Sequence, residues 1–156
     1  MVSVMTAASY VYYRYAKEFH SKIDEMKLHK LLYFAQRESI IQTDTPLFDA
    51  SFYGWRFGPI LKEIREAYSS DSFVRIINPA TEKELLPIMD VVFQIYASKD
   101  SWSLSRLTHG ETSWQKSRAG IPDTVNSDRK IDIADIRIDA NRIKERRNMF
   151  AHFGSN

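Results

Sequence analysis

The sequence contains no cysteine among its 156 residues. This absence excludes disulfides, thiolate nucleophiles and cysteine-ligated zinc or iron–sulfur centres, and it fits a reducing compartment. Apolar runs are also short, because none approaches the roughly 18 residues that a membrane-spanning helix needs. The N-terminal stretch MVSVMTAASYVYYRYAKEF lacks the basic start of a signal peptide and carries Tyr and Arg in its middle. We therefore expect a cytoplasmic protein with no membrane partner.

Glycine is scarce as well. Five glycines leave little room for a phosphate-binding loop, and no GxSxG nucleophile motif occurs. The four histidines are scattered, and no pair has the HxxxH or HExxH spacing that places two metal ligands on one helix face. A Ser-His-Asp site assembled through space stays open. The pattern predicts a protein that has no cofactor, metal site or catalytic residue and is not an enzyme.

The rest of the composition is typical of one folded domain. Hydrophobic residues make up 44% of the chain and charged residues 27%. A chain of this length can bury about 70% of the surface that it exposes when unfolded, so it can hold a core unaided. We predict a single domain over residues 1–156, with its core between about residues 6 and 150.

Apolar residues recur at helical spacing along most of the chain. The clearest case is Leu28, Leu31, Leu32 and Ala35, at positions i, i+3, i+4 and i+7. Helices are expected over residues 6–19, 24–43, 59–68, 81–98 and 132–150, with short helices around Leu104 and Trp114 and a short strand or aromatic loop over residues 46–58. The predicted fold class is mainly α: a compact single-domain bundle of about six or seven helices with at most a minor β element.

Several residues mark where these helices begin. Asp24 is suited to cap the second helix, and Pro59 is suited to the first turn of the third, where its missing N–H costs nothing. Thr81 and Glu84 have the spacing of a capping box. Pro87 then lies too deep for a first-turn position, so the helix either starts nearer Glu84 or kinks.

The C-terminal segment is rich in charge of both signs. Asp132, Asp135 and Asp139 have a spacing that suggests an acidic metal site, but basic residues surround them, which favours a solvated helix face. A basic cluster follows, formed by Arg142, Lys144, Arg146 and Arg147. Such a cluster can follow a phosphate backbone, but basic residues near a helix C-terminus also complement the helix dipole. The net charge of only +2 favours the dipole role, and a nucleic-acid-binding regulator is kept as an alternative.

Aromatic residues are plentiful, with 9 Phe, 8 Tyr and 3 Trp. Tyr10, Tyr12, Tyr13 and Tyr15 occupy more than one face of the first helix, so not all of them can be buried. Exposed Tyr and Trp beside Arg are typical of protein-binding hot spots, while small helical domains also use aromatic residues in their cores. We take Tyr12, Tyr13 and Arg56 as a candidate partner surface.

Residues 52–64 read FYGWRFGPILKEI, in which two aromatic residues bracket an arginine. Trp55 and Phe57 lie two positions apart, so in an extended segment both point to the same side. We expect that side to pack on the helix that contains residues 27–36. Arg56 would then lie on the opposite face, free for a partner.

Three stretches of the chain stand out together: KLHKLLYFAQ, GWRFGPI and LSRLTHGETSW. In their order and spacing they resemble the SocA-like Panacea-domain antitoxin family, which also includes phage-associated proteins, and the likeness extends over roughly residues 6–145. The residues taken as family-motif positions, with either a structural or a partner-binding role, are Lys27, Lys30, Tyr33, Gln36, Trp55, Phe57, Gly58, Pro59, Thr108, His109 and Trp114. His29, Ile60 and Ser113 depart from the family pattern, and Ser113 replaces a proline whose loss would loosen the entry to Trp114.

The resemblance implies an antitoxin that binds and neutralises a cognate toxin encoded beside it, without catalysis. It also implies an alternative, in which the protein is a proteolytic adaptor that delivers the toxin to a ClpXP-type protease. Pairing of the same domain with unrelated toxins suggests binding rather than one shared reaction. The identity of the toxin, the binding surface and the oligomeric state stay open at this point.

Overall fold

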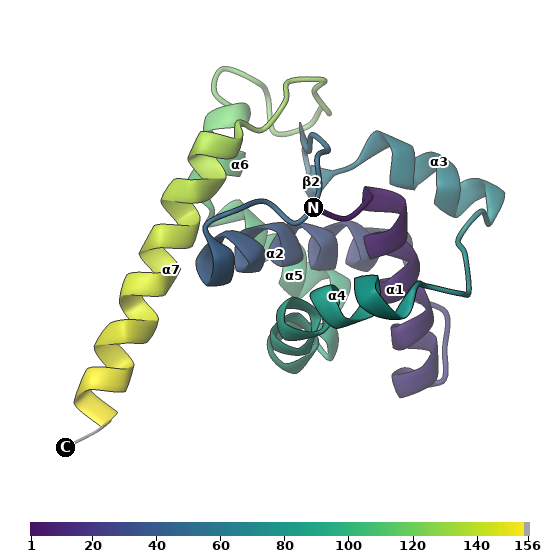
Figure 1. Ribbon diagram of the computed structural model, residues 1–156. Helices are drawn as coiled ribbons and strands as arrows, with labels where there is room; N and C mark the ends of the chain where they lie inside the picture. The colour runs from purple at the N-terminus through teal and green to yellow at the C-terminus, as the bar shows by residue number, and fades with distance from the viewer. Residues whose placement is uncertain (155–156) are drawn as a thin grey trace.

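The computed structural model describes residues 1–154; residues 155 and 156, at the end of the predicted domain, lie outside this range. Figure 1 shows a mainly α-helical protein with a small hairpin, which confirms the predicted fold class. The elements are α1 (Val4–Phe19), α2 (Glu25–Thr43), β1 (Tyr53–Trp55), β2 (Gly58–Ile60), α3 (Lys62–Ser70), α4 (Pro79–Val92), the π-helical turn η1 (Phe93–Ala97), α5 (Ser101–His109), α6 (Thr112–Ser117) and α7 (Ile133–Gly154).

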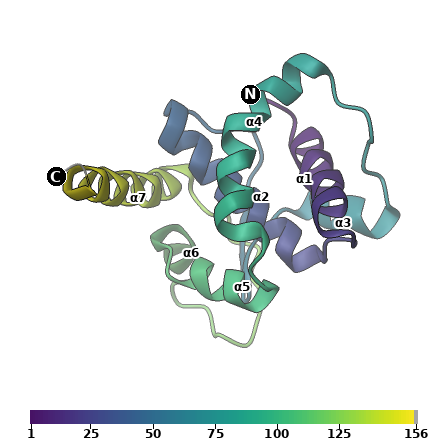
Figure 2. The same cartoon turned by 90° about the horizontal axis from the view of Figure 1, so that it is seen from below.

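Helix α2 runs through the middle of the protein, with the other helices around it (Figures 1 and 2). Its predicted stripe is fully buried, including Leu28, Leu31 and Leu32. Burial is not confined to that stripe, because each position from 27 to 40 is buried. A helix enclosed on all sides forces its polar side chains to find hydrogen-bond partners inside the protein.

The start of α2 follows the prediction. Asp24 caps the helix, accepting a hydrogen bond from the Lys27 backbone N–H at 2.9 Å, and the helix ends at Thr43 as expected. The expected helix start at Pro59 is wrong. Pro59 lies in β2, opposite Gly54 of β1, and α3 begins only at Lys62. The Gly-Pro pair instead begins β2, directly after the two-residue hairpin turn, and Gly58 takes a φ of +120° that favours glycine.

The start of α4 also differs from the prediction. The cap is Asn78, whose side chain accepts a hydrogen bond from the Ala80 N–H at 2.8 Å, and Pro79 takes the first helical position. The capping-box start at Thr81 and the alternative start near Glu84 are therefore both wrong. The helix continues past Pro87 to Val92 and then widens into η1.

The hairpin does not bury its aromatic residues as expected. Arg56 and Phe57 form the turn between the strands, so strand alternation ends at Trp55. Phe57 is 38% exposed and meets the ring of Trp102 edge-on, with 5.1 Å between the ring centroids. The Arg56 guanidinium lies 4.5 Å from the centroid of the same Phe57 ring. The predicted separation of Arg56 from the aromatic side is thus wrong.

Helix α7 contacts α2 and α6 from its start as far as Arg147, and its C-terminal end extends away from the rest of the protein (Figures 1 and 2). Asp132 precedes it and accepts a hydrogen bond from the Ala134 N–H at 2.9 Å. Among the described residues, no helix is both long and apolar enough to cross a membrane.

Candidate functional site

The three sequence motifs meet at one corner, between α2, the hairpin and α5. Lys30 of α2 donates a hydrogen bond to the Pro59 carbonyl of β2 at 3.2 Å. Gly58 lies so close to both neighbours that a Cβ there would fall 2.5 Å from Thr108 Oγ1 and 2.6 Å from Lys30 Cε. The backbone of the second motif is therefore in contact with side chains from the other two.

Lys30 is an unusual residue at this corner. It is only 1% exposed, and its ammonium group makes the single described hydrogen bond to Pro59. Burial lowers the pKa of Lys30 to about 7, against the opposing effect of Glu25 and Asp24. The side chain therefore lies near the balance between its charged and neutral forms at neutral pH.

The third motif joins the same corner through two aromatic rings. Trp114 donates its indole N–H to the Trp55 carbonyl at 2.8 Å. The His109 ring stacks on Trp114, with 4.1 Å between centroids and 9° between planes. Burial lowers the pKa of His109, which favours the neutral imidazole.

Ser113, the departure from the family pattern, has its own hydrogen bonds. Its hydroxyl lies 2.7 Å from the buried Tyr33 hydroxyl, and its backbone N–H donates to Asp139 at 2.8 Å. A proline at this position has neither group. The entry to Trp114 is therefore held by hydrogen bonds, and the expected loosening is wrong.

The remaining polar motif residues on α2 also contact the protein's own backbone. Lys27 donates to the Ala97 carbonyl at 3.1 Å. Gln36 donates to the Phe48 carbonyl at 2.9 Å and accepts from the Leu47 N–H at 2.8 Å. These contacts fix η1 and the segment after α2, so the motif residues on α2 satisfy polar groups inside the fold.

A pocket of about 300 Å³ opens beside this corner, lined by Glu25, His29, Lys30, Trp55, Phe57 and Arg65 among others. His29 accepts from the Leu61 N–H through Nδ1 at 3.2 Å, and its Nε2 faces Glu25 at 3.1 Å. The pocket's lining carries no hydroxyl nucleophile. Within the described part of the chain, no group of three or more His, Cys, Asp or Glu residues could hold a metal ion.

A second polar centre, which the sequence did not predict, joins α2 to α7. Arg37 of α2 forms a buried ion pair with Glu111 and donates to the Tyr96 hydroxyl at 2.5 Å. Arg142 of α7 contacts the other Glu111 oxygen at 3.2 Å. Burial raises the pKa of Glu111 to about 7, and the two arginines act in the opposite direction.

Asp139 is the other carboxylate of this centre. Its predicted place on a solvated face is wrong, because it is 0% exposed. It accepts the Thr112 and Ser113 backbone N–H groups at 2.8 Å each, and so caps α6 from a different helix. Burial acts to raise its pKa, but these hydrogen bonds from Ser113 and Thr112 lower it overall. No local pattern in the sequence indicates this role, since the two partners lie 26 and 27 residues away.

The predicted basic cluster is divided by these contacts. Arg142 pairs with Glu111 and Asp139, and Arg147 holds the buried Glu38 carboxylate through two bonds of 2.8 and 2.9 Å. Lys144 and Arg146 are exposed. Two of the four cations are therefore already matched by carboxylates, which weakens the case for a phosphate-binding surface.

The predicted partner surface is not brought together at one place. Tyr12 and Tyr13 are half-buried on α1, where Tyr13 donates to the Phe73 carbonyl at 3.3 Å and the Tyr12 ring lies 4.7 Å from that of Phe73. Arg56 lies on the hairpin turn, where its backbone N–H donates to Asn126 at 3.0 Å. The tyrosines and Arg56 thus belong to different contacts.

Comparison with known proteins gives one family. A model of the family described as "Antitoxin SocA-like, Panacea domain" matches residues 28–115, more than half of the chain. The chain is also similar to a protein named Antitoxin SocA from Caulobacter vibrioides (strain NA1000 / CB15N), with 31% identity over 70 residues. That match covers 45% of this chain but only 37% of the relative. No solved structure gives a significant match.

Proposed function

Since the chain belongs to the SocA-like Panacea antitoxin family, we propose that it is an antitoxin that binds a cognate toxin protein in the cytoplasm and neutralises it without catalysis. The observation that carries the proposal is the family match over the same three motifs that meet in the structure. The side chains of these motifs mostly contact the protein's own backbone, as Lys30, Gln36 and Trp114 do. A frame of this kind supports binding, whereas catalysis needs groups directed at a substrate.

Co-expression tests the proposal. Each adjacent reading frame is expressed alone in a bacterial host and then together with this protein. We expect one neighbour to stop growth alone, growth to recover on co-expression, and the two proteins to co-purify. Neighbours that are harmless alone, or a toxic neighbour that never associates with this protein, would contradict the proposal.

The dose needed for rescue separates binding from catalysis. Neutralisation by binding requires at least one antitoxin molecule per toxin molecule, so activity of the purified toxin should fall in proportion to added antitoxin and vanish near equimolar amounts. Complete neutralisation at a small fraction of that amount would instead indicate an enzyme. In cells, a toxin half-life that this protein leaves unchanged supports direct inhibition, and a shortened half-life would assign the effect to degradation.

A further inference from the structure

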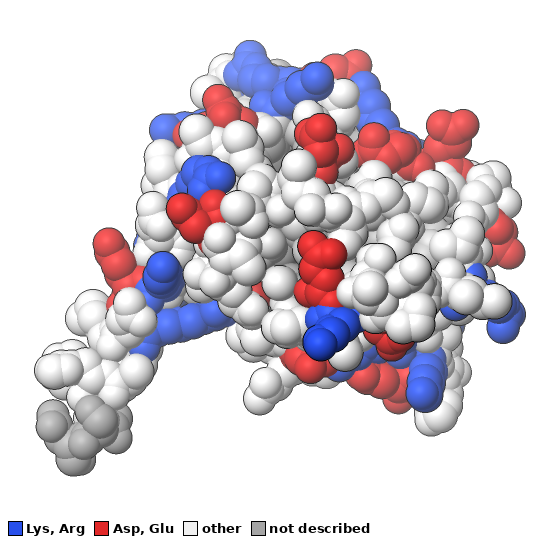
Figure 3. All heavy atoms as spheres, in the orientation of Figure 1, with Lys and Arg blue, Asp and Glu red and all other residues white. Residues whose placement is uncertain are grey.

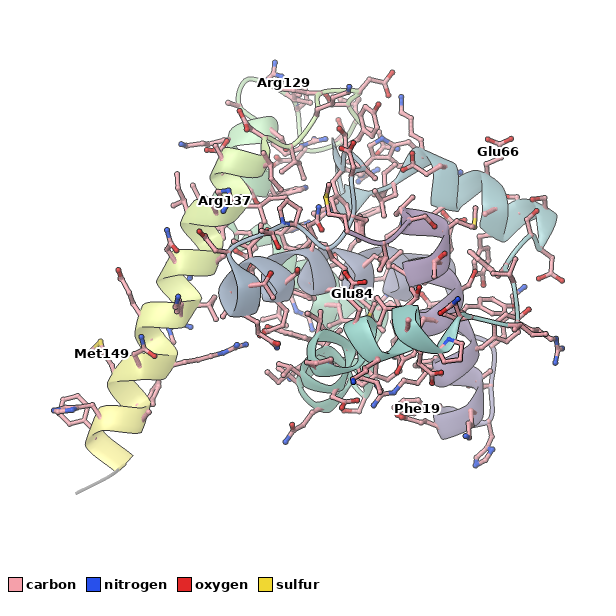
Figure 4. The ribbon with its side chains drawn as sticks, in the orientation of Figure 1. Phe19, Glu66, Glu84, Arg129, Arg137 and Met149 are labelled. Atoms are coloured by element: carbon pink, nitrogen blue, oxygen red, sulfur yellow. The ribbon has the colours of Figure 1, made fainter. Side chains whose placement is uncertain are left out.

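The outer end of α7 exposes a group of large apolar side chains. Met149, Phe150 and Phe153 are 60%, 72% and 67% exposed. Figures 1 and 2 show this end extending away from the other helices, and Met149 points outward in Figure 4. Figure 3 shows basic atoms where the helix leaves the rest of the protein and mostly uncharged atoms further out. Single exposed apolar residues are ordinary, but a contiguous set on one element marks an interaction surface.

These residues share one helix face. Arg146, Met149, Phe150 and Phe153 stand at positions i, i+3, i+4 and i+7, and with Arg142 and Glu145 they line a shallow hollow of about 420 Å³. This is the spacing of the anchors that an amphipathic helix inserts into a groove of a partner. Aromatic residues and arginine are also the residue types that dominate binding energy at protein interfaces.

The base of this helix is fixed to the frame. Arg147 holds Glu38 of α2, and Asp139 holds the start of α6. An anchored helix loses little further conformational freedom when a partner encloses its outer end, and preorganisation of this kind strengthens binding.

The position of this face relative to the family match indicates its occupant. The matched residues 28–115 contain the motif corner, whereas all of α7 lies beyond them. Residues 146–153 therefore lie outside the segment that identifies the family, which leaves them available for contacts particular to this chain's own partner.

We propose that residues 146–153 of α7 form a docking helix that enters an apolar groove with an acidic rim on the toxin; this inference rests on the function proposed above. Arg146 borders the apolar face, and Lys144 adds a second exposed cation, against one neighbouring acid, Glu145. A second copy of this chain would place two such basic stretches against each other, and like charges repel. An acidic rim on the toxin would instead attract them.

Isothermal titration of the purified toxic neighbour against variants of the full chain tests the docking helix. The double change Phe150→Ala and Phe153→Ala removes two anchors, and the Kd should rise by a factor on the order of 10 to 100. Ile138→Ala is the matched control, because Ile138 is an exposed apolar residue on the attached half of α7; its Kd should stay within about twofold of the wild type. Equal binding by the double variant and the control would overturn the inference.

The charge of the rim is tested with a matched pair. Arg146→Glu should weaken binding by about tenfold or more, because Arg146 lines the face. Lys144→Glu makes the same charge change two positions away, off the face, and should have a smaller effect. Equal losses from both variants would mean general charge attraction and would overturn the acidic rim.

Two further readouts keep the outcomes separate. Amide hydrogen exchange of the wild type should show new protection of residues 146–153 on toxin addition, and protection that appears only elsewhere would overturn the inference. Sedimentation of the wild type alone should give a monomer; a dimer that Phe150→Ala with Phe153→Ala converts to a monomer would assign the face to self-association. If the wild type binds no toxin at all, the proposed function fails before this inference is reached.

Discussion

At the scale of single residues, Lys30 is a buried polar side chain on the central helix α2 that finds one hydrogen-bond acceptor inside the protein. Its ammonium group is enclosed between α2 and the hairpin and donates to the Pro59 carbonyl. Water cannot solvate the charge there, so the pKa falls from 10.5 to about 7. Between these two values the unfolded chain binds a proton that the folded protein lacks.

This difference predicts a pH dependence of stability. Because folding depresses the pKa of Lys30, the associated stability is complete above about pH 10.5 and is lost as the pH falls toward about 7. The free energy of unfolding should therefore rise with pH over this window, by at most about 1.4 kcal/mol per pH unit. Lys30→Met keeps a side chain of similar length without the titration. Urea unfolding of both proteins at pH 7, 8 and 9 should show the free energy of unfolding of the wild type rising relative to that of the variant. A difference in free energy that stays constant with pH would contradict the shifted pKa.

Gly58 gives a second prediction at this scale. Its φ of +120° and its contacts with Thr108 and Lys30 leave no space for a Cβ. Gly58→Ala should lower the free energy of unfolding by about 2–4 kcal/mol, from backbone strain and overpacking. Gly110→Ala is the control, because the nearest atom to its Cβ would be the Leu107 carbonyl oxygen at 3.4 Å. Chemical denaturation compares the two, and equal effects would show that the close approach at Gly58 is unimportant.

At the scale of elements, α6 depends on α7 for its cap. Asp139→Ala leaves the Thr112 and Ser113 N–H groups without their acceptor, which should cost about 2–4 kcal/mol. Asp135→Ala, one turn earlier on the same helix, removes only a surface ion pair with Lys116 and should cost less than about 1 kcal/mol. Urea denaturation gives the free energies, and amide exchange at Thr112 and Ser113 shows where the loss occurs. Fast exchange there in the wild type would argue against the cap.

The elements that the sequence predicts well are those with local signals. The core stripe of α2 and its Asp24 cap depend on residues three or four positions apart, so both could be read from the chain alone. The prediction for Pro59 is wrong because a Gly-Pro pair suits either a helix start or a hairpin, and only the pairing of β1 with β2 decides between them. Burial of Glu111 and Asp139 could not be predicted, because the partners of each are remote in sequence, as Arg37 is from Glu111.

At the scale of the whole molecule, α7 has an attached half, which reaches to Arg147, and an outer end that exposes large apolar side chains. The attached half joins α2 and α6 through Arg147, Arg142 and Asp139, which all contact buried carboxylate or backbone groups. At the outer end, the large apolar side chains of Met149, Phe150 and Phe153 are largely exposed. Stability and partner recognition should therefore be separable along one helix.

A chain that stops after Asn148 tests this division without any toxin. The residues removed include Met149, Phe150 and Phe153, whose exposure means that little apolar burial is lost. The free energy of unfolding should stay within about 1 kcal/mol of the full chain. Glu38→Ala is the contrasting variant, because it removes a buried carboxylate that anchors Arg147 at the end of the attached half, and it should cost about 1–3 kcal/mol. Thermal and urea unfolding measure both changes; a truncated chain that loses as much stability as Glu38→Ala would place the outer end of α7 in the frame rather than at a docking surface.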